Sequence, residues 1–160
     1  MAIFLSDNVI EKLLKESKPL PNNYRSKIQV RPKRGHKESE LDITGNEGND
    51  FRLIVRQSNI NAFDFSIILA YIPPKSTKLF RLRRYNGKNH QHTNPIEKVT
   101  FYDYHIHYAT ERYQALGARE DTYAKATDRY SNLHQAVNCM IQDCGFQVPP
   151  DPQGVLFEDM

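Results

Sequence analysis

Two pairs of histidines are the residues of this chain best suited to carry chemistry. Four of the six histidines lie between positions 90 and 107. They form two His-x-His pairs, His90 with His92 and His105 with His107. Histidine titrates near neutral pH, so it can act as an acid or a base, and its neutral imidazole is a common metal ligand. The pairs therefore indicate either proton transfer or metal binding.

Strand alternation predicts which side chains share a sheet face with the second pair. In a strand over residues 99–108, His105 and His107 point away from the face that carries Tyr104 and Ile106. The same alternation in a strand over residues 78–85 buries its apolar positions and turns the others outward. If these strands are neighbours, one face gathers a set of polar side chains: Arg81, Arg83, Tyr85, Asp103, His105 and His107.

This set suits phosphodiester cleavage without a metal. The reaction needs a base for the attacking 2′-hydroxyl and an acid for the leaving oxygen, and we expect His92 and His107 in these roles. Asp103 would orient an imidazole, and Tyr85 would stack on a base or donate a proton. Arginine binds phosphate and stabilises the charge of the transition state. His90 and His105 are the other predicted catalytic histidines, and Arg81 and Arg83 are predicted to bind the reacting phosphate. Further phosphate contacts are expected from Arg84, Lys88 and Arg112.

Metal binding is the rival interpretation of the first histidine pair. His90, His92 and Glu97 stand as His-x-His-x4-Glu, which resembles the first motif of the cupin family. Neutral imidazoles suit zinc, iron or nickel, and His105 or His107 would complete such a site. The second cupin motif is absent from the sequence. We therefore prefer the metal-free interpretation and expect no cofactor.

Missing motifs argue against nucleotide-dependent, dinucleotide-dependent and zinc-ribbon functions. The sequence has no Walker A loop, no Gly-x-Gly-x-x-Gly, no Gly-x-Ser-x-Gly and no Cys-x2-Cys pair. Its two cysteines, Cys139 and Cys144, form no disulfide framework. No apolar stretch approaches the roughly 20 residues of a membrane span, and the N-terminus does not resemble a signal peptide. We expect a soluble, cytoplasmic protein.

The positive charge is concentrated in two windows. The net charge is only +3, but residues 17–37 hold seven Lys or Arg and no acid, and residues 65–96 hold six and no acid. Clustered charge of one sign attracts phosphate or acidic surfaces. RNA and an acidic protein, such as an antitoxin, are the expected partners. A non-enzymatic module that binds nucleic acid or protein through this basic face is the alternative to an enzyme.

The elements that must position these residues predict an α+β fold. Helical spacing marks residues 7–17, 110–116 and 128–144, with Asp128 as the N-cap of the last helix. Between them, an antiparallel meander of five or six strands begins at Ile28 and Val30, and the two C-terminal helices pack on the sheet. Residues 64–72 are apolar on both faces, which predicts a central strand. The predicted domain is 1–147, and 148–160 is a Pro-rich acidic tail.

The segment from residue 80 to residue 94, FRLRRYNGKNHQHTN, resembles a motif of small prokaryotic toxins of the TumE type. There, an Arg-aromatic-Asp-Asn run ends a strand and a His-rich loop follows. The segment is also similar to an uncharacterised prokaryotic family that shares the Arg-Tyr-Asn-Gly…His-x-His stretch. The resemblance covers residues 78–113 and maps onto Arg84, Tyr85, Asn86, His90 and His92. It implies a metal-independent ribonuclease of a toxin–antitoxin pair, which is the function we expect.

Overall fold

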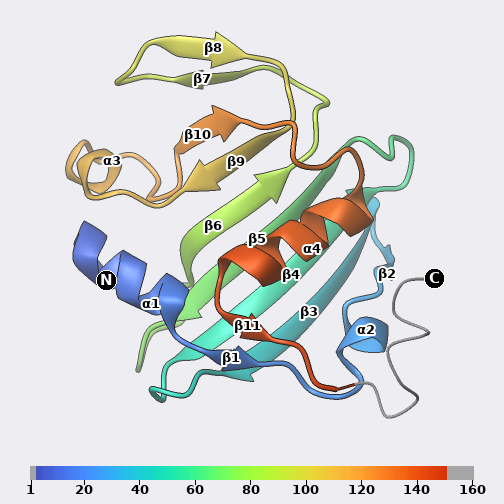
Figure 1. Ribbon diagram of the computed structural model, residues 1–160. Coiled ribbons are helices and arrows are strands. Elements are labelled where there is room, and N and C mark those ends of the chain that lie inside the picture. The colour runs from blue at the N-terminus through green and yellow to red at the C-terminus, as the bar shows by residue number, and fades with distance from the viewer. Residues whose placement is uncertain (1–2, 151–160) are drawn as a thin grey trace.

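A seven-stranded antiparallel sheet runs through the molecule (Figure 1). The computed structural model describes residues 3–150. The strand order is β10-β9-β6-β5-β4-β3-β2, so the chain meanders through neighbouring strands. The strands are β2 (Arg31–Lys33), β3 (His36–Thr44), β4 (Asp50–Ser58), β5 (Phe65–Ile72), β6 (Phe80–Asn86), β9 (His105–Tyr108) and β10 (Tyr123–Ala126). The predicted α+β class and antiparallel meander are confirmed, and the apolar β5 is the central strand.

One face of the sheet is the core face. Helix α4 (Leu133–Asp143) lies across it, together with the parallel pair of β1 (Lys18–Pro19) and β11 (Phe146–Gln147), and helix α1 (Asp7–Lys15) lies to one side (Figure 1). Alternate strand residues fill the space beneath them, because successive side chains of a strand point to opposite faces. The central ones are at most 1% exposed: Phe51, Leu53, Val55, Ile67 and Leu69.

A buried lysine joins the ends of the two core helices. Lys18 is completely inaccessible to solvent, and its Nζ donates to four main-chain carbonyls. These are the carbonyls of Leu13, Leu14 and Glu16 at the end of α1, at 2.7, 3.0 and 2.8 Å, and of Cys144 at the end of α4, at 2.8 Å. A helix end leaves its last carbonyls without partners, so one ammonium group satisfies both ends.

The opposite face of the sheet is polar. Register pairing places Glu38, Arg56, Ser66, Asn86 and His105 in one row across five consecutive strands. Towards β9 and β10 this face is covered by a separate hairpin of β7 (His92–Asn94) and β8 (Val99–Phe101) (Figure 1). The short helices α2 (Tyr24–Lys27) and α3 (Glu111–Ala115) lie outside the two layers.

Some predicted element bounds were wrong. The strand expected at residues 28–30 is preceded by α2 and is replaced by β2. Residues 99–108 form two strands in different sheets, and β10 was not predicted. Helix α4 begins after Asn132, whose side chain accepts from the Gln135 amide, and not at Asp128. None of the helices in residues 3–150 is long and apolar enough to cross a membrane. Most of the predicted tail, residues 151–160, lies outside the described residues.

A bulge in β6 reverses the predicted faces of its second half. Against β5, the pairing passes from Arg81 opposite Ala70 directly to Arg83 opposite Leu69, so Leu82 is an extra residue. An inserted residue shifts the two-residue alternation by one. Arg81 therefore lies on the polar face, as predicted, but Arg83 and Tyr85 lie on the core face, which corrects the expectation for both. Arg84 and Asn86 lie on the polar face instead.

Candidate metal centre

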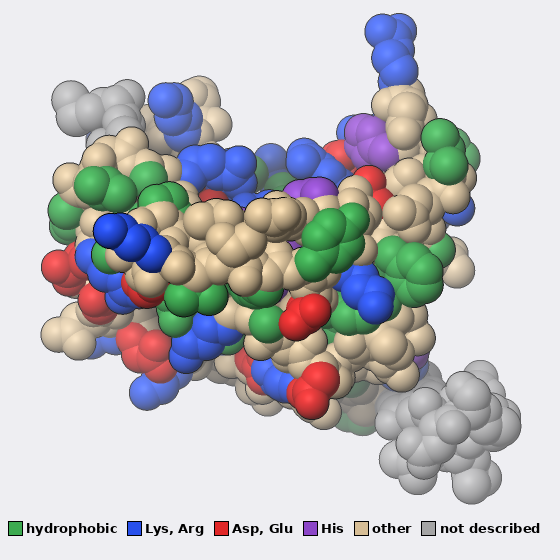
Figure 2. Space-filling model, turned by 90° about the horizontal axis from the view of Figure 1, so that it is seen from above, with side chains coloured by type: hydrophobic (Ala, Val, Ile, Leu, Met, Phe, Trp, Pro, Cys, Tyr) green, Lys and Arg blue, Asp and Glu red, His purple; other side chains and the backbone are tan. Residues whose placement is uncertain are grey.

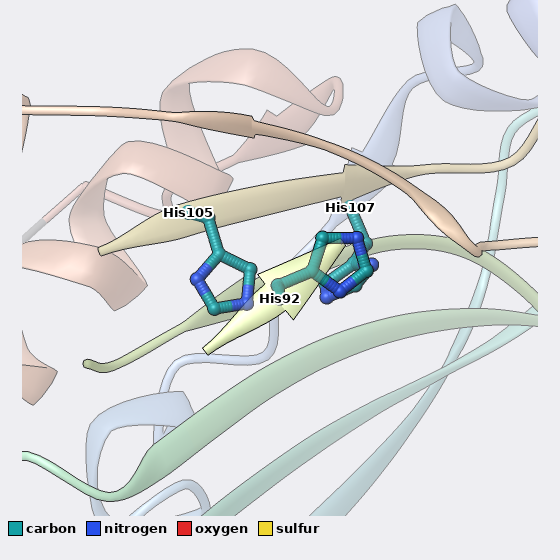
Figure 3. Close-up of side chains that lie close together, drawn as sticks. All are labelled: His92, His105 and His107. Atoms are coloured by element: carbon teal, nitrogen blue, oxygen red, sulfur yellow. The ribbon is translucent and has the colours of Figure 1, made fainter. Parts of the chain in front are cut away.

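Three histidines converge between the hairpin and the sheet (Figure 3). His92 comes from β7, and His105 and His107 come from β9. The ring centroid of His92 lies 5.5 Å from that of His105 and 4.8 Å from that of His107, and the centroids of His105 and His107 are 5.0 Å apart. One nitrogen of each ring lies within 4.8 Å of one nitrogen of each other ring. This three-histidine cluster is the candidate site.

The fold brings the cluster together through the pairing of β6, β9 and β10. His105 and His107 alternate on the polar face of β9, where His107 lies between Arg84 of β6 and Ala124 of β10. Phe101 of β8 packs against the rings of His92 and His105, with centroids 5.6 and 5.5 Å away. As a result His105 and His107 are only 2% and 3% exposed.

The main chain fixes the tautomer of both β9 histidines. Nδ1 of His105 lies 2.8 Å from the Asp103 carbonyl oxygen, and Nδ1 of His107 lies 2.7 Å from the Asp121 carbonyl oxygen. A carbonyl oxygen only accepts, so each Nδ1 carries the proton. The lone pair of each neutral ring is therefore on Nε2.

Asn94 fixes the tautomer of the third histidine. Its Nδ2 donates to the Ala124 carbonyl at 2.7 Å, and its Oδ1 accepts from the Ala124 amide at 3.0 Å. This pairing determines which end of the Asn94 amide is the oxygen. The same Oδ1 lies 2.8 Å from Nε2 of His92, so that nitrogen must be the donor. The lone pair of His92 is consequently on Nδ1.

In each of the three imidazoles one nitrogen is thus held as a donor, and the other has no hydrogen-bond partner among the described residues. This arrangement is typical of histidines that bind metals, where the second nitrogen donates to a carbonyl or carboxylate and orients the ring. Burial lowers the pKa of His105 to about 4 and that of His107 to about 2, and the positive charge of Arg84 lowers both as well. Both rings are therefore neutral at physiological pH, which is the form that binds a metal.

The cluster opens into a small cavity. Its volume is about 220 Å³, and its walls are Arg84, Asn86, His90, His92, His105, His107, Arg119, Asp121 and Thr122. The Asp121 side chain is completely buried and accepts from Nε of Arg84 at 2.9 Å and from Nε of Arg119 at 3.3 Å. Figure 2 shows the molecule from above, where histidine side chains lie beside basic and acidic side chains. The cavity therefore combines metal-ligand and anion-binding groups.

The structure brings only part of the predicted site together. His90 lines the cavity with the cluster. Arg81 does not line it but pairs with Asp121, which does, with its Nε 3.7 Å from the Asp121 carboxylate. Glu97 does not join His90 and His92, which corrects the proposed cupin-like ligand set. Its carboxylate instead accepts from the Tyr113 hydroxyl at 2.6 Å and pairs with Arg112.

Four other predicted residues lie away from the cavity. The Tyr85 hydroxyl donates to Asp143 of α4 at 2.5 Å, and the Arg83 guanidinium stacks on the Tyr108 ring at 4.8 Å. Lys88 lies over the Tyr104 ring at 5.3 Å, and Arg112 is bound to Glu97.

Sequence reasoning missed Asn94, Arg119 and Asp121. Asn94 stands two residues after His92, but nothing in the sequence shows that its amide pairs with a strand 30 residues away. Arg119 and Asp121 lie in the turn before β10, a strand that was itself not predicted.

Comparison with known proteins adds a family but no activity. Residues 5–144 match a protein family described as a family of unknown function (DUF6978). No curated protein and no solved structure matches the chain.

Proposed function

Because the match spans most of the chain, the protein belongs to the DUF6978 family, and we propose that it is a metalloprotein whose three-histidine cluster binds one divalent transition-metal ion. The observation that carries the proposal is that each imidazole of the cluster has one nitrogen fixed as a hydrogen-bond donor. Three different acceptors, the carbonyls of Asp103 and Asp121 and the amide oxygen of Asn94, each hold one imidazole nitrogen. One nitrogen of each imidazole lies within 4.8 Å of one nitrogen of each of the other two.

Zinc fits this donor set best. Three histidines with a fourth position left for water are one of the standard ligand sets of catalytic zinc sites. Tetrahedral coordination at about 2.0–2.1 Å places the ligand nitrogens about 3.3 Å apart, so the nitrogens of the cluster would each move inward by less than about 1 Å. His92 lies on a separate hairpin, which allows such a closure. A zinc ion there would act as a Lewis acid on a ligand or water in the cavity.

The neutral histidines favour this proposal over acid–base catalysis without a metal. A general acid must be protonated at the working pH, and catalytic groups work best with a pKa near it. Burial lowers the pKa of His105 and His107 far below neutrality. Ribonuclease activity, and binding to RNA or to an acidic protein, stay predictions that a metal centre does not exclude.

The test is a metal titration with substitutions that keep the protein's own hydrogen bonds. His105→Asn and His107→Asn retain a donor in the place of Nδ1, and His92→Gln retains one in the place of Nε2, while each removes the proposed ligand nitrogen. After treatment with EDTA and dialysis, we expect calorimetry to show one Zn²⁺ per wild-type chain. Each variant should bind at least 100-fold more weakly.

His134→Asn is the matched control, because this histidine is exposed on α4 and should not affect binding. Cobalt substitution gives a second readout, since Co²⁺ bound to three histidines has visible absorption bands that report its coordination. Absence of stoichiometric binding in the folded wild type, or undiminished binding in all three variants, would refute the proposal.

A further inference from the structure

Two guanidinium groups that line the cavity have terminal N–H donors that can bind a ligand. Arg84 and Arg119 both bind Asp121 through Nε. Among the described residues, no acceptor is hydrogen-bonded to the terminal nitrogens of either group. The side chains keep 18% and 54% of their surface exposed. The terminal nitrogens can therefore bind a ligand in the cavity without displacing the buried carboxylate.

The balance of charge around the cavity favours an anion. Arg81, Arg84 and Arg119 surround two carboxylates, Asp121 and Glu120, of which Glu120 lies 3.3 Å from Arg81. Three positive groups against two negative ones leave an excess of one positive charge before any metal binds. A dication held by neutral histidines raises the excess to three. An anionic ligand on the fourth metal position would offset this charge in a partly buried site.

The size of the cavity limits what can enter it. Its volume of about 220 Å³ is below the roughly 300–1,000 Å³ of pockets that enclose a drug-sized ligand. It can hold a tetrahedral anionic group, and the rest of a larger molecule would remain outside. Arginine forks match the oxygens of phosphate in pairs, which distinguishes phosphate from chloride or hydroxide.

We infer that the fourth metal position takes an oxygen of a phosphate group, whose other oxygens are bound by Arg84 and Arg119. This inference rests on the proposed metal site. The phosphate is either free inorganic phosphate or the terminal phosphate of a larger ester. Both sources share the same recognition, since the metal and the two arginines contact only the phosphoryl oxygens.

The experiment uses the full chain, titrated first with metal and then with ligand. Inorganic phosphate, adenosine 5′-monophosphate and the diester ApA are added separately to the Zn²⁺-loaded and the metal-free protein, and binding is followed by calorimetry. With Co²⁺ in place of zinc, phosphate binding should shift the visible absorption bands. We expect the loaded protein to bind phosphate at least tenfold more tightly than the metal-free protein.

Arg119→Met is the decisive variant, because this side chain is half exposed and the buried Asp121 keeps its hydrogen bond from Arg84. It should weaken phosphate binding at least tenfold and leave zinc binding unchanged. Arg84→Met should weaken phosphate binding as well. Arg52→Met is the control, since Arg52 lies on the same face but pairs with Asp42 outside the cavity, at 2.7 Å.

The outcomes separate this inference from the proposed function. Stoichiometric zinc binding without any response to phosphate overturns the inference and leaves the metal site intact. Equal phosphate affinity with and without metal overturns it too, as does an unchanged affinity in Arg119→Met. Absence of zinc binding overturns both. Tighter binding of the nucleotide than of inorganic phosphate identifies an ester as the ligand, and preference for inorganic phosphate identifies the free ion.

Discussion

Asn94 and Ala124 are joined by two hydrogen bonds in which the side-chain amide of one pairs with the main chain of the other. The pairing ties the β7–β8 hairpin to β10, an edge strand of the main sheet. It also presents Oδ1 to Nε2 of His92. The third histidine of the cluster therefore owes both its place and its tautomer to a residue that does not itself belong to the ligand set.

Asn94→Ala should weaken metal binding by about 10–100-fold, the usual cost of losing a partner that orients a ligand. The substitution frees the His92 ring to rotate and loosens the hairpin, but removes no ligand atom. Zinc affinity measured by competition with a chelator tests this. Asn138→Ala, on the exposed face of α4, is the control and should have no effect. Unchanged affinity in Asn94→Ala would show that the hairpin is positioned by other contacts.

Tyr85→Phe should lower stability and leave zinc and phosphate binding unchanged. The Tyr85 ring is completely buried on the core face, and its hydroxyl donates to Asp143, a carboxylate also bound by Arg129 at 2.8 Å. A hydrogen bond to a charged group contributes about 1.5–3 kcal/mol. Urea denaturation measures the loss, with Tyr102→Phe as the control, since Tyr102 follows β8 and is exposed. A loss of phosphate binding without a loss of stability would show that Tyr85 contributes to the site and would contradict this prediction.

Lys18→Met should lower the free energy of unfolding by about 2–4 kcal/mol, because four buried carbonyls at two helix ends lose their charged donor. Methionine fills a similar volume, so the effect comes from the ammonium group. Lys15→Met is the control, since this exposed lysine pairs with the exposed Glu11 one turn away and should change stability by less than about 0.5 kcal/mol. A loss in Lys18→Met no larger than that of the control contradicts this assignment.

Glu38 should make the fold sensitive to acid. Burial opposes its ionisation, but hydrogen bonds from His36 and Lys33 and the charge of Arg56 lower its pKa from 4.5 to about 2. Since the folded pKa lies below the unfolded one, the stabilisation is present above about pH 4.5 and is lost as the pH falls towards 2. With screening at the exposed partners, it amounts to about 1–3 kcal/mol.

Urea denaturation of wild type and Glu38→Gln at pH 7, 5 and 3 measures this contribution. The difference in stability between the two proteins should shrink as the pH falls. Glu40→Gln, on the same strand but half exposed, should show a smaller and flatter difference. A difference that stays constant from pH 7 to pH 3 would show that Glu38 is not ionised in the way described.

The sequence predicted features that depend on local periodicity. The apolar run over residues 64–72 marked the central strand because it is apolar on both faces, and Ile67 and Ile68 are indeed both buried. Alternation on β9 placed His105 and His107 together, opposite Tyr104 and Ile106. The adjacency of β6 and β9, on which the predicted site depended, is confirmed. Regular spacing along one segment was enough for each of these.

Only the tertiary structure decided which residues join those histidines. The bulge at Leu82 depends on how β6 pairs with β5, and it exchanges Arg83 and Tyr85 for Arg84 and Asn86 on the polar face. The fold of the hairpin over β9 brings in His92 and turns Glu97 away to Tyr113. Sequence alone thus identified the histidines and placed two of them, His105 and His107, on one face of a strand. The third histidine, its tautomer and the neighbouring arginines depend on contacts between distant segments, and these arise only when the sheet pairs and the hairpin closes.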